Sequence, residues 1–333
     1  MKIETKIDNL KNHKLLVKLM RSIDNFLQEE EFLKIDVPLL SPALIPESYL
    51  EFFETKNVYY EEKQRLYLIP SPELFLKRLM VQGAGNCYYL GKSFRNNEPI
   101  EIKHSYEFTM LEFYRVNGDY FNIVDDVMNL LRFLAKEIYG KAEIDYQGKK
   151  VNFEKFEKIT VAEAFNKYAG ITDIFDHKSF FEQAKNKGYR IDGLDYTDVW
   201  SQVYGIEVEP NLGKNGMPTI IFEYPRELAA TAQFNKEKNV AERLEFYIEG
   251  IELGNCGNAA TDKTNMEEHK MRFENDIKIR KKLGMVDCNP DFDFIDVLHN
   301  LPRCAGIAIG VDRLAMIFAN LKSIQDLRVI QFE

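Results

Sequence analysis

The sequence predicts an α+β fold from three observations. Apolar residues recur at helical spacing over residues 14–31 and again over residues 120–139. Residues 104–115 form an aromatic-rich block that predicts a strand. The chain then ends with a predicted strand over residues 305–311 and a helix over residues 312–320. With 333 residues, 45% of them apolar, the chain is long enough for a real core.

The remaining elements follow in chain order. An extended segment after the first helix ends near Pro38. A Pro-Ser-Pro triplet ending at Pro72 starts a helix over residues 73–81, because proline suits the first turn of a helix. Residues 141–200, rich in Lys and Glu, predict a small insertion of short helices. Residues 211–218 predict a glycine-rich turn.

The last long helix shows a start and a stop signal. Thr264 and Glu267 have the spacing of a capping box. The predicted helix runs to Leu283 and stops at Gly284. Because no repeat, low-complexity segment or linker divides the chain, we expect a single domain over residues 1–333.

Composition excludes several classes of protein. The 53 acidic residues outnumber the 44 basic ones, which gives a formal charge of −9 and argues against a strongly basic nucleic-acid binder. The chain shows neither an apolar signal core nor a run long enough to span a membrane. The four cysteines are scattered without a Cys-x-x-Cys motif, which argues against a disulfide framework or a zinc finger. We therefore expect a cytoplasmic protein.

The predicted strand over residues 104–115 carries a candidate site on one face. Alternate residues of a strand share a face, so Phe108, Met110, Glu112 and Tyr114 point the same way. That face offers an aromatic ring, a carboxylate and a phenol. The alternative is a core strand with one buried acid.

A second candidate site is a hairpin with two acids. Glu249 and Gly250 suit a two-residue turn that pairs Tyr247 with Glu252. Glu245 then lies on the same face as Glu252, as its diagonal neighbour. Two adjacent carboxylates suit Mg²⁺ shared with substrate phosphates. The alternative is two solvated acids on an edge hairpin.

Two weaker signals lie elsewhere. Gly306 and Gly310 remove side chains where the last strand meets its helix, and Arg313 at the helix start can stack on a base or pair with a phosphate. Glu73 lies in the first turn of its helix, where it either binds a substrate amine or pairs with the helix dipole.

The order of these segments resembles a known family. Arg95, residues 104–114, residues 245–255 and residues 306–313 resemble motif 2, the metal-binding segment and motif 3 of the class II aminoacyl-tRNA synthetases. Pro38 resembles the motif 1 proline of their dimer interface.

The resemblance is strongest in the lysine branch. Residues 72–78 (Pro-Glu-Leu-x-Leu-Lys-Arg) and 107–114 (Glu-Phe-Thr-Met-Leu-Glu-Phe-Tyr) are similar to lysyl-tRNA synthetases. Residues 208–214 and 310–313 resemble the short paralogues that attach lysine or β-lysine to elongation factor P.

The resemblance implies an antiparallel sheet flanked by helices, ATP and Mg²⁺ as cofactors, an amino-acid substrate, and usually a homodimer. The motif 1 segment begins within the first 40 residues, so we expect no anticodon-binding OB barrel, no tRNA, and an acceptor protein similar to elongation factor P. The implied chemistry needs no protein nucleophile, because the substrate carboxylate attacks the α-phosphorus itself.

The resemblance also implies site residues. Those for ATP are Arg95, Glu98, His104, Phe108, Glu245, Glu252, Gly310 and Arg313. Those for the amino acid are Glu73, Glu112, Tyr114, Asn255 and Asn258. Among them, Arg95 and Arg313 are implied to be catalytic, and Glu245 and Glu252 are implied to bind Mg²⁺.

One segment departs from the lysine enzymes. Their Asn-Gly-Phe-x-Glu motif packs a ring on the lysine stem and pairs an acid with its ammonium, but Gly257 and Ala259 stand at those two positions here. A buried ammonium without its counter-ion costs roughly 2–5 kcal/mol. We therefore expect an amino acid other than α-lysine, bulkier or less basic, with Asn258 able to read a neutral polar group.

Three alternatives stay open. The chain could be a small-molecule amide-forming ligase of the asparagine synthetase A type, a non-catalytic paralogue, or a fragmentary tRNA synthetase. Retention of both arginines and both metal-site acids argues against the non-catalytic paralogue.

Overall fold

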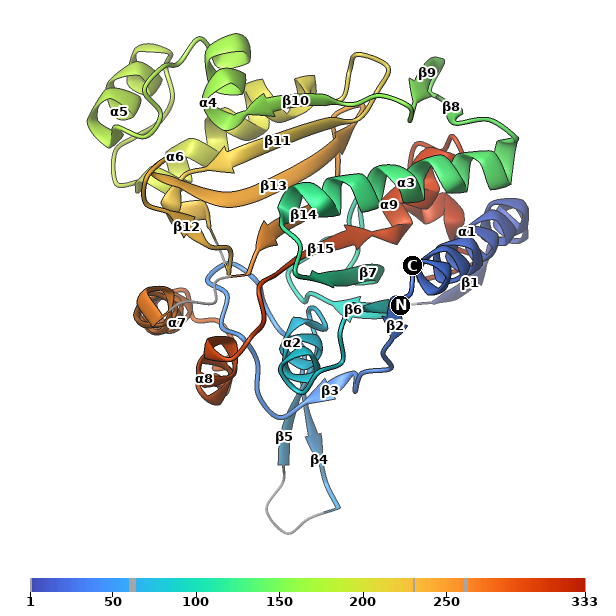
Figure 1. Cartoon of the computed structure of the whole chain (residues 1–333), viewed down its shortest axis with the longest axis horizontal. Coiled ribbons are helices and arrows are strands. Elements are labelled where there is room, and N and C mark those ends of the chain that lie inside the picture. Colours follow the sequence, from blue (N-terminus) through green and yellow to red (C-terminus); the bar gives the residue numbers. More distant parts are fainter. Residues whose placement is uncertain (1, 60–63, 230, 260–262, 333) are drawn as a thin grey trace.

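The chain folds around one large mixed sheet (Figure 1). The computed structural model describes residues 2–59, 64–229, 231–259 and 263–332. Within them nine strands form the main sheet, with β12 (Phe234–Asn235) beside β13. The other strands run in the order β10 (Glu157–Thr160), β11 (Thr219–Tyr224), β13 (Val240–Ile248), β14 (Ile251–Asn258), β15 (Cys304–Gly310), β7 (Glu107–Val116), β6 (Cys87–Phe94) and β2 (Leu33–Lys34).

Most neighbours in this sheet are antiparallel. The pairs β10–β11 and β2–β6 at the two ends are parallel. The predicted hairpin is confirmed, because β13 and β14 pair Tyr247 with Glu252 around the turn at Glu249 and Gly250. The predicted α+β fold, an antiparallel sheet flanked by helices, is therefore confirmed at its centre.

Smaller sheets complete the strands. They comprise β1 (Ile3–Thr5) with β16 (Ile330–Phe332), β3 (Leu40–Ser41) with β5 (Gln64–Leu68) and β4 (Glu54–Asn57), and β8 (Glu143–Tyr146) with β9 (Lys149–Asn152). The pairing of β1 with β16 brings the two ends of the chain together.

Helices cover both faces of the sheet. They are α1 (Leu10–Glu29), α2 (Glu73–Val81), α3 (Tyr120–Tyr139), α4 (Val161–Ala164), α5 (His177–Asn186), α6 (Tyr196–Val203), α7 (Lys263–Lys282), α8 (Asp293–His299) and α9 (Val311–Phe318). The bounds of α2 and α3 are those predicted. No helix in the described residues is long and apolar enough to cross a membrane.

The first helix starts earlier than residues 14–31 predict. It begins at Leu10, after a 3₁₀ turn over Ile7–Asn9. Its polar first turns bind the far end of the chain: Asn9 Nδ2 donates to the carbonyl of Arg328 at 2.9 Å, and Asn12 Nδ2 donates to that of Asp326 at 3.1 Å. Apolar periodicity cannot show such contacts.

The prediction of short helices over residues 141–200 is wrong for its first part. Residues 143–160 hold the β8–β9 hairpin and strand β10, and the short helices start at Val161. Strand β10 forms by pairing with β11, about sixty residues later in the chain, and this non-local contact leaves no local pattern.

The last predicted elements hold to within a residue or two. Strand β15 starts at Cys304 and α9 ends at Phe318. Helix α7 ends just before Gly284, whose φ is +69°. The capping box predicted at Thr264 rests on a side chain outside the described part of the chain.

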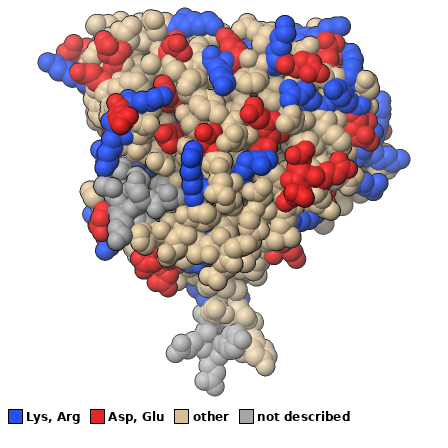
Figure 2. Space-filling model, in the orientation of Figure 1, with Lys and Arg blue, Asp and Glu red and all other residues tan. Residues whose placement is uncertain are grey.

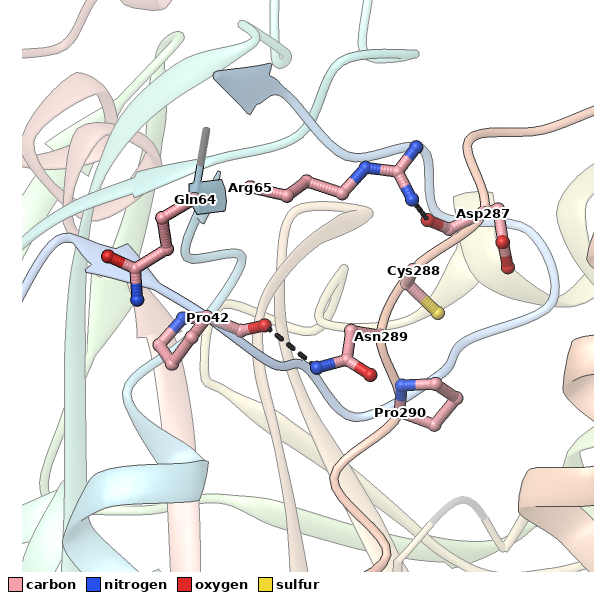
Figure 3. A pocket seen from close by; sticks show the side chains of 7 residues that line it. All are labelled: Pro42, Gln64, Arg65, Asp287, Cys288, Asn289 and Pro290. Carbon is pink, nitrogen blue, oxygen red and sulfur yellow. Dashed lines mark hydrogen bonds between the residues drawn. The ribbon is translucent and has the colours of Figure 1, made fainter. Parts of the chain in front are cut away.

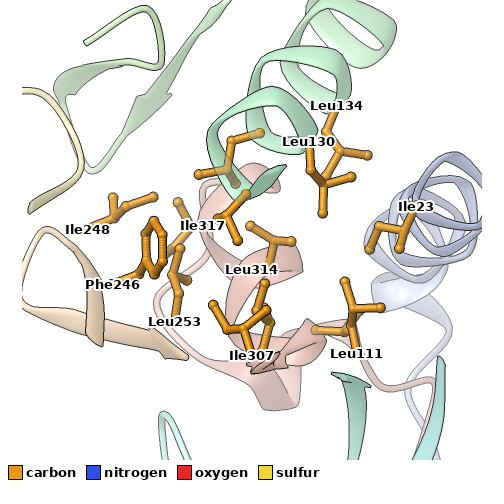
Figure 4. Packing of buried hydrophobic residues seen from close by; sticks show 14 of the residues in the cluster. Ile23, Leu111, Leu130, Leu134, Phe246, Ile248, Leu253, Ile307, Leu314 and Ile317 are labelled. Carbon is orange, nitrogen blue, oxygen red and sulfur yellow. The ribbon is translucent and has the colours of Figure 1, made fainter. Parts of the chain in front are cut away.

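The main core lies on one face of the sheet (Figure 4). Side chains of α1, α3 and α9 pack there on alternate residues of β7, β13 and β15. Leu111 and Phe113 belong to this core, which confirms the predicted alternation of β7. The opposite face is therefore available for Phe108, Met110, Glu112 and Tyr114.

Candidate active site

The face of the sheet opposite the main core holds a pocket at the ends of β7, β14 and β15. Seventeen residues line it. The predicted site residues among them are Arg95, Glu98, His104, Phe108, Glu252, Asn255, Gly310 and Arg313. The structure thus brings together residues from four distant segments.

One end of the pocket is basic. The Arg95 guanidinium lies 5.2 Å from the centre of the Phe108 ring, and its Nη1 is 3.8 Å from Glu98. The Nε of Arg95 is buried and has no hydrogen-bond partner among the described residues. Because buried donors are normally paired, this atom indicates an anionic ligand.

Arg313 closes this end from the start of α9. Its Nε donates to the carbonyl of Lys103 at 3.1 Å, and its Nη1 donates to the carbonyl of Glu252 at 3.0 Å. Burial lowers the pKa of His104, and the charge of Arg313 lowers it further. An anion bound nearby would offset the charge of Arg313 and raise the pKa of His104.

Lys103 is a pocket residue that sequence reasoning missed. Its Nζ donates to the carbonyl of Gly250 at 3.3 Å, and burial lowers its pKa. Its position next to His104 in a loop with Arg95 was the available signal. A half-buried lysine beside Arg313 adds a further cation for phosphate oxygens.

The two candidate metal ligands differ in their surroundings. Glu252 lines the pocket, and its side chain lies 3.5 Å from Arg313 Nη1. Glu245 lies behind it and is not part of the pocket lining. Its Oε1 accepts from Arg243 at 2.7 Å, and its Oε2 accepts from Tyr247 at 2.8 Å.

The two carboxyls nevertheless influence each other. Burial raises the pKa of Glu252, and the neighbouring charge of Glu245 raises it further. A divalent cation would relieve this repulsion, so the pair fits Mg²⁺ that also binds substrate phosphates. No group of three or more His, Cys, Asp or Glu side chains suited to a metal occurs in the described residues.

A β-bulge places Asn255 on the face of Glu252. Tyr247 pairs with Glu252 but Phe246 pairs with Gly254, so Leu253 is an extra residue in β14. In a regular strand, residues 252 and 255 would point to opposite faces. The bulge turns both into the same pocket.

Glu112 is not among the residues that line the pocket, but it pairs with Ala308, which does. It lies in one row with Ala308 and Asn255 across β7, β15 and β14. Its Oε1 accepts a hydrogen bond from Tyr114 at 2.7 Å, while its buried Oε2 has no partner among the described residues. Burial, and then the charge of Glu73, raises the pKa of Glu112 to about 8.

Glu73 is the first residue of α2. Its Oε1 accepts from the buried ammonium of Lys77 and from the Thr231 hydroxyl at 2.9 Å. Burial acts to raise the pKa of Glu73, but these partners outweigh it and the pKa is lowered. Glu73 is therefore ionised, whereas Glu112 beside it is protonated. Sequence reasoning missed both partners: the spacing of four between Glu73 and Lys77 was an available signal, whereas Thr231 had none.

Asn258 is turned away from the pocket, contrary to the prediction. Its Oδ1 accepts from the backbone N–H of Tyr120 at 2.7 Å, and its Nδ2 donates to Glu242 at 2.7 Å. The hydrogen bond from Tyr120 holds the Asn258 side chain at the start of α3. The segment after Asn255 thus supports a neighbouring helix instead of reading the substrate.

A second hollow lies between the β3–β5 strands and residues 287–290 (Figure 3). Its lining includes Arg65, which donates to the carbonyl of Asp287 at 2.9 Å, and Asn289, which donates to that of Pro42 at 3.1 Å. These side chains bind backbone carbonyls, and no predicted site residue lines the hollow. We therefore assign the chemistry to the first pocket.

Comparison with known proteins agrees with this geometry. Residues 3–332 match the family model described as tRNA synthetases class II (D, K and N). The chain is 32% identical to an elongation factor P–(R)-β-lysine ligase of Avibacterium paragallinarum, over 95% of this chain and 94% of the relative. It is 35% identical to a lysine–tRNA ligase of Buchnera aphidicola subsp. Schizaphis graminum, over 93% of this chain but only 61% of the relative.

Proposed function

Because this chain belongs to the class II tRNA synthetase family of the D, K and N type, we propose that it is an ATP-dependent ligase that adenylates an amino acid and transfers it to a lysine of a protein similar to elongation factor P. The observation that carries the proposal is the arrangement on one sheet face. Arg95, Arg313 and Glu252 line one pocket, where the nucleotide would bind, and Glu112 pairs with the pocket residue Ala308, where the amino acid would bind.

The reaction uses positioned charges and no protein nucleophile. A carboxylate oxygen of the amino acid bonds to the α-phosphorus of ATP while the bond to pyrophosphate breaks. The acceptor amine then bonds to the acyl carbon, AMP leaves, and the amine loses a proton to solvent. Arg95 and Arg313 would stabilise negative charge at phosphorus, and the pocket walls would hold the reactants in line.

The residues present fit ATP and Mg²⁺. The unpaired Nε of Arg95 and the cations Lys103 and Arg313 suit phosphate oxygens, and Phe108 offers a stacking surface for the base. Glu252 and Glu245 would hold Mg²⁺, which would neutralise charge on the phosphates.

The protein acceptor is proposed from similarity to relatives that are elongation factor P ligases. The chain spans 61% of the lysine–tRNA ligase but 94% of the elongation factor P ligase. A second elongation factor P–(R)-β-lysine ligase, from Yersinia enterocolitica, is 32% identical over 91% of its length. We extend the proposal to a cytoplasmic homodimer, as the resemblance implies.

Pyrophosphate exchange tests the function. Purified protein with ATP, Mg²⁺ and a mixture of amino acids should incorporate labelled pyrophosphate into ATP. Adding elongation factor P should then increase its mass by one aminoacyl group. Exchange without transfer to the protein, but with an amide product when ammonia is added, would instead favour the asparagine synthetase A type. Absence of exchange with every amino acid would exclude the proposed ligase.

A further inference from the structure

The small residues Gly257 and Ala259 do not enlarge the amino-acid site, contrary to the expectation from sequence. A Cβ built on Gly257 would lie 2.7 Å from the Cβ of Ala232. Ala232 also forms a β-bridge with Ala259. The segment before β12 therefore fills the space that a larger side chain at residue 257 would need.

The neighbouring glycine is covered as well. Gly306 lies between Tyr114 and Gly257 in the row across β7, β15 and β14. A Cβ on Gly306 would lie 2.3 Å from atoms of the Tyr114 ring. The ring thus occupies the trough that the two glycines leave, and the site is closed on this side.

The wall at Ala259 is apolar. Ala259 is 6% exposed and belongs to a buried cluster with Tyr114, Phe273 and Cys304. A substrate group that reached this wall would meet methyl, aromatic and thiol surface. An ammonium there would lose its hydration without gaining a counter-ion.

One acid near the site, Glu73, already has partners. Glu73 binds Lys77, whose side chain is 3% exposed, and the charge of His269 also lowers the pKa of Glu73. The Nζ of Lys77 lies 5.7 Å from the centre of the Tyr114 ring. If Glu73 also binds the α-ammonium, a second substrate ammonium would face Lys77 at close range.

Glu112 supplies the opposite chemistry. Its raised pKa keeps the carboxyl protonated near neutral pH. Because Oε1 already accepts from Tyr114, the proton belongs on Oε2, which is buried and unpaired among the described residues. A protonated carboxyl is a strong donor, so this atom lacks an acceptor. Lys77 is a second donor on the same side.

From this geometry we propose that the amino-acid site selects a side chain with a carbonyl oxygen, either an amide or a carboxylic acid, and rejects one that ends in an ammonium. Glu112 donates to the carbonyl, and the walls formed by Tyr114, Ala232 and Ala259 limit its length. The inference rests on the proposed function and names the substrate class of the same site.

A panel of amino acids tests this selection by pyrophosphate exchange. Glutamine, asparagine, glutamate and aspartate provide the carbonyl, norleucine provides length without polarity, and lysine and (R)-β-lysine provide the ammonium. We expect kcat/KM for one carbonyl substrate to exceed that for lysine, (R)-β-lysine and norleucine at least tenfold. The amide and acid arms then distinguish the two sources of the carbonyl. Equal or better exchange with either lysine isomer overturns the inference.

A pair of variants tests the wall. Ala259→Glu supplies an acid there, and Ala259→Gln supplies the same shape without charge. We expect kcat/KM for lysine to be at least tenfold higher in Ala259→Glu than in Ala259→Gln, because the two variants share a shape and differ in charge. Equal effects of both would contradict the charge argument. If neither variant folds, as judged by thermal unfolding, the panel with wild-type protein decides.

The two proposals fail differently. Exchange that prefers lysine contradicts the substrate class and retains the ligase. If no amino acid supports exchange, the ligase is excluded, and calorimetric titration of glutamine, aspartate and lysine into the protein still tests the selection. Tighter binding of lysine in that titration would overturn it.

Discussion

Glu112 links the amino-acid site to the stability of the fold. Its pKa is about 8 in the folded protein against an ordinary value of 4.5, so the folded chain holds a proton that the unfolded chain releases between these values. Because the folded state binds more protons, the free energy of unfolding falls as the pH rises through this range.

The variant Glu112→Gln should remove this pH dependence. Each pH unit lowers the free energy of unfolding of the wild type by up to about 1.4 kcal/mol. Between pH 6 and 8 this free energy should therefore fall by ~2 kcal/mol more in the wild type than in the variant. Urea unfolding at the two pH values measures the difference. Identical losses in both proteins would mean that Glu112 titrates normally in the folded state.

Arg313 is the second residue with a measurable role. The variant Arg313→Lys keeps the charge but loses the planar fork that contacts Lys103 and Glu252. We expect kcat/KM in pyrophosphate exchange to fall on the order of 100-fold, as for other lost transition-state donors. Arg303→Lys is the matched control, because the Arg303 side chain is 73% exposed. Its ion pair with Asp119 is a long surface contact of 3.8 Å between Nη2 and Oδ2. Equal loss in both variants would argue against a role at phosphorus.

At the scale of elements, one buried arginine joins α7 to the loop beside the site. Arg280 donates to the carbonyls of Glu47 at 2.9 Å, Leu50, and Val286 at 2.9 Å. Its guanidinium also lies 4.1 Å from the centre of the Phe52 ring. The loop that carries Glu47 therefore depends on this helix.

The variant Arg280→Met should destabilise the fold by about 3 kcal/mol or more, because it removes the side-chain donor from three carbonyls and the charged partner from the Glu51 carboxylate. Lys278→Met on the exposed face of α7 should change stability by less than ~0.5 kcal/mol. Chemical denaturation of both variants provides the comparison. A small effect of Arg280→Met would mean that water replaces its donors.

The elements differ in how far the sequence predicts them. Helices α2 and α3 follow from local signals, a proline start and a helical apolar stripe. Strands β10 and β11 were missed, since each forms by pairing with a partner distant in sequence. The bulge at Leu253 was also missed, because nothing in a single strand shows where its partner shifts register.

At the scale of the whole molecule, charge bears on the acceptor. Acidic and basic side chains are interspersed over the face that Figure 2 shows, and the net charge is −9. Binding of nucleic acid depends on cations that neutralise phosphates. The overall field is therefore unfavourable to a polyanion.

Incubation with total tRNA should accordingly produce no aminoacyl-tRNA. We expect no mobility shift of tRNA at low-micromolar protein and low salt, while elongation factor P gains mass in the same buffer. A lysine–tRNA ligase serves as the positive control. Charging of any tRNA would contradict the proposed acceptor.

Much of the site was predictable residue by residue. The order of Arg95, Glu112, Glu252 and Arg313 along the chain marks the family, and the structure gathers them on one sheet face. Lys77 and Thr231 were not predicted, because their importance comes from contact with Glu73.

By itself the sequence determined the fold class, the family and many of the residues that line one pocket, since these rest on local patterns and on motifs in a set order. Only the tertiary structure decided what surrounds Gly257 and Ala259. Ala232, Tyr114 and Lys77 fill or charge the space beside Gly257 and Ala259, and Asn258 turns to α3. The reason is physical: the chain lists which atoms are missing at a position, but neighbours from other strands determine whether that space is empty, apolar or charged.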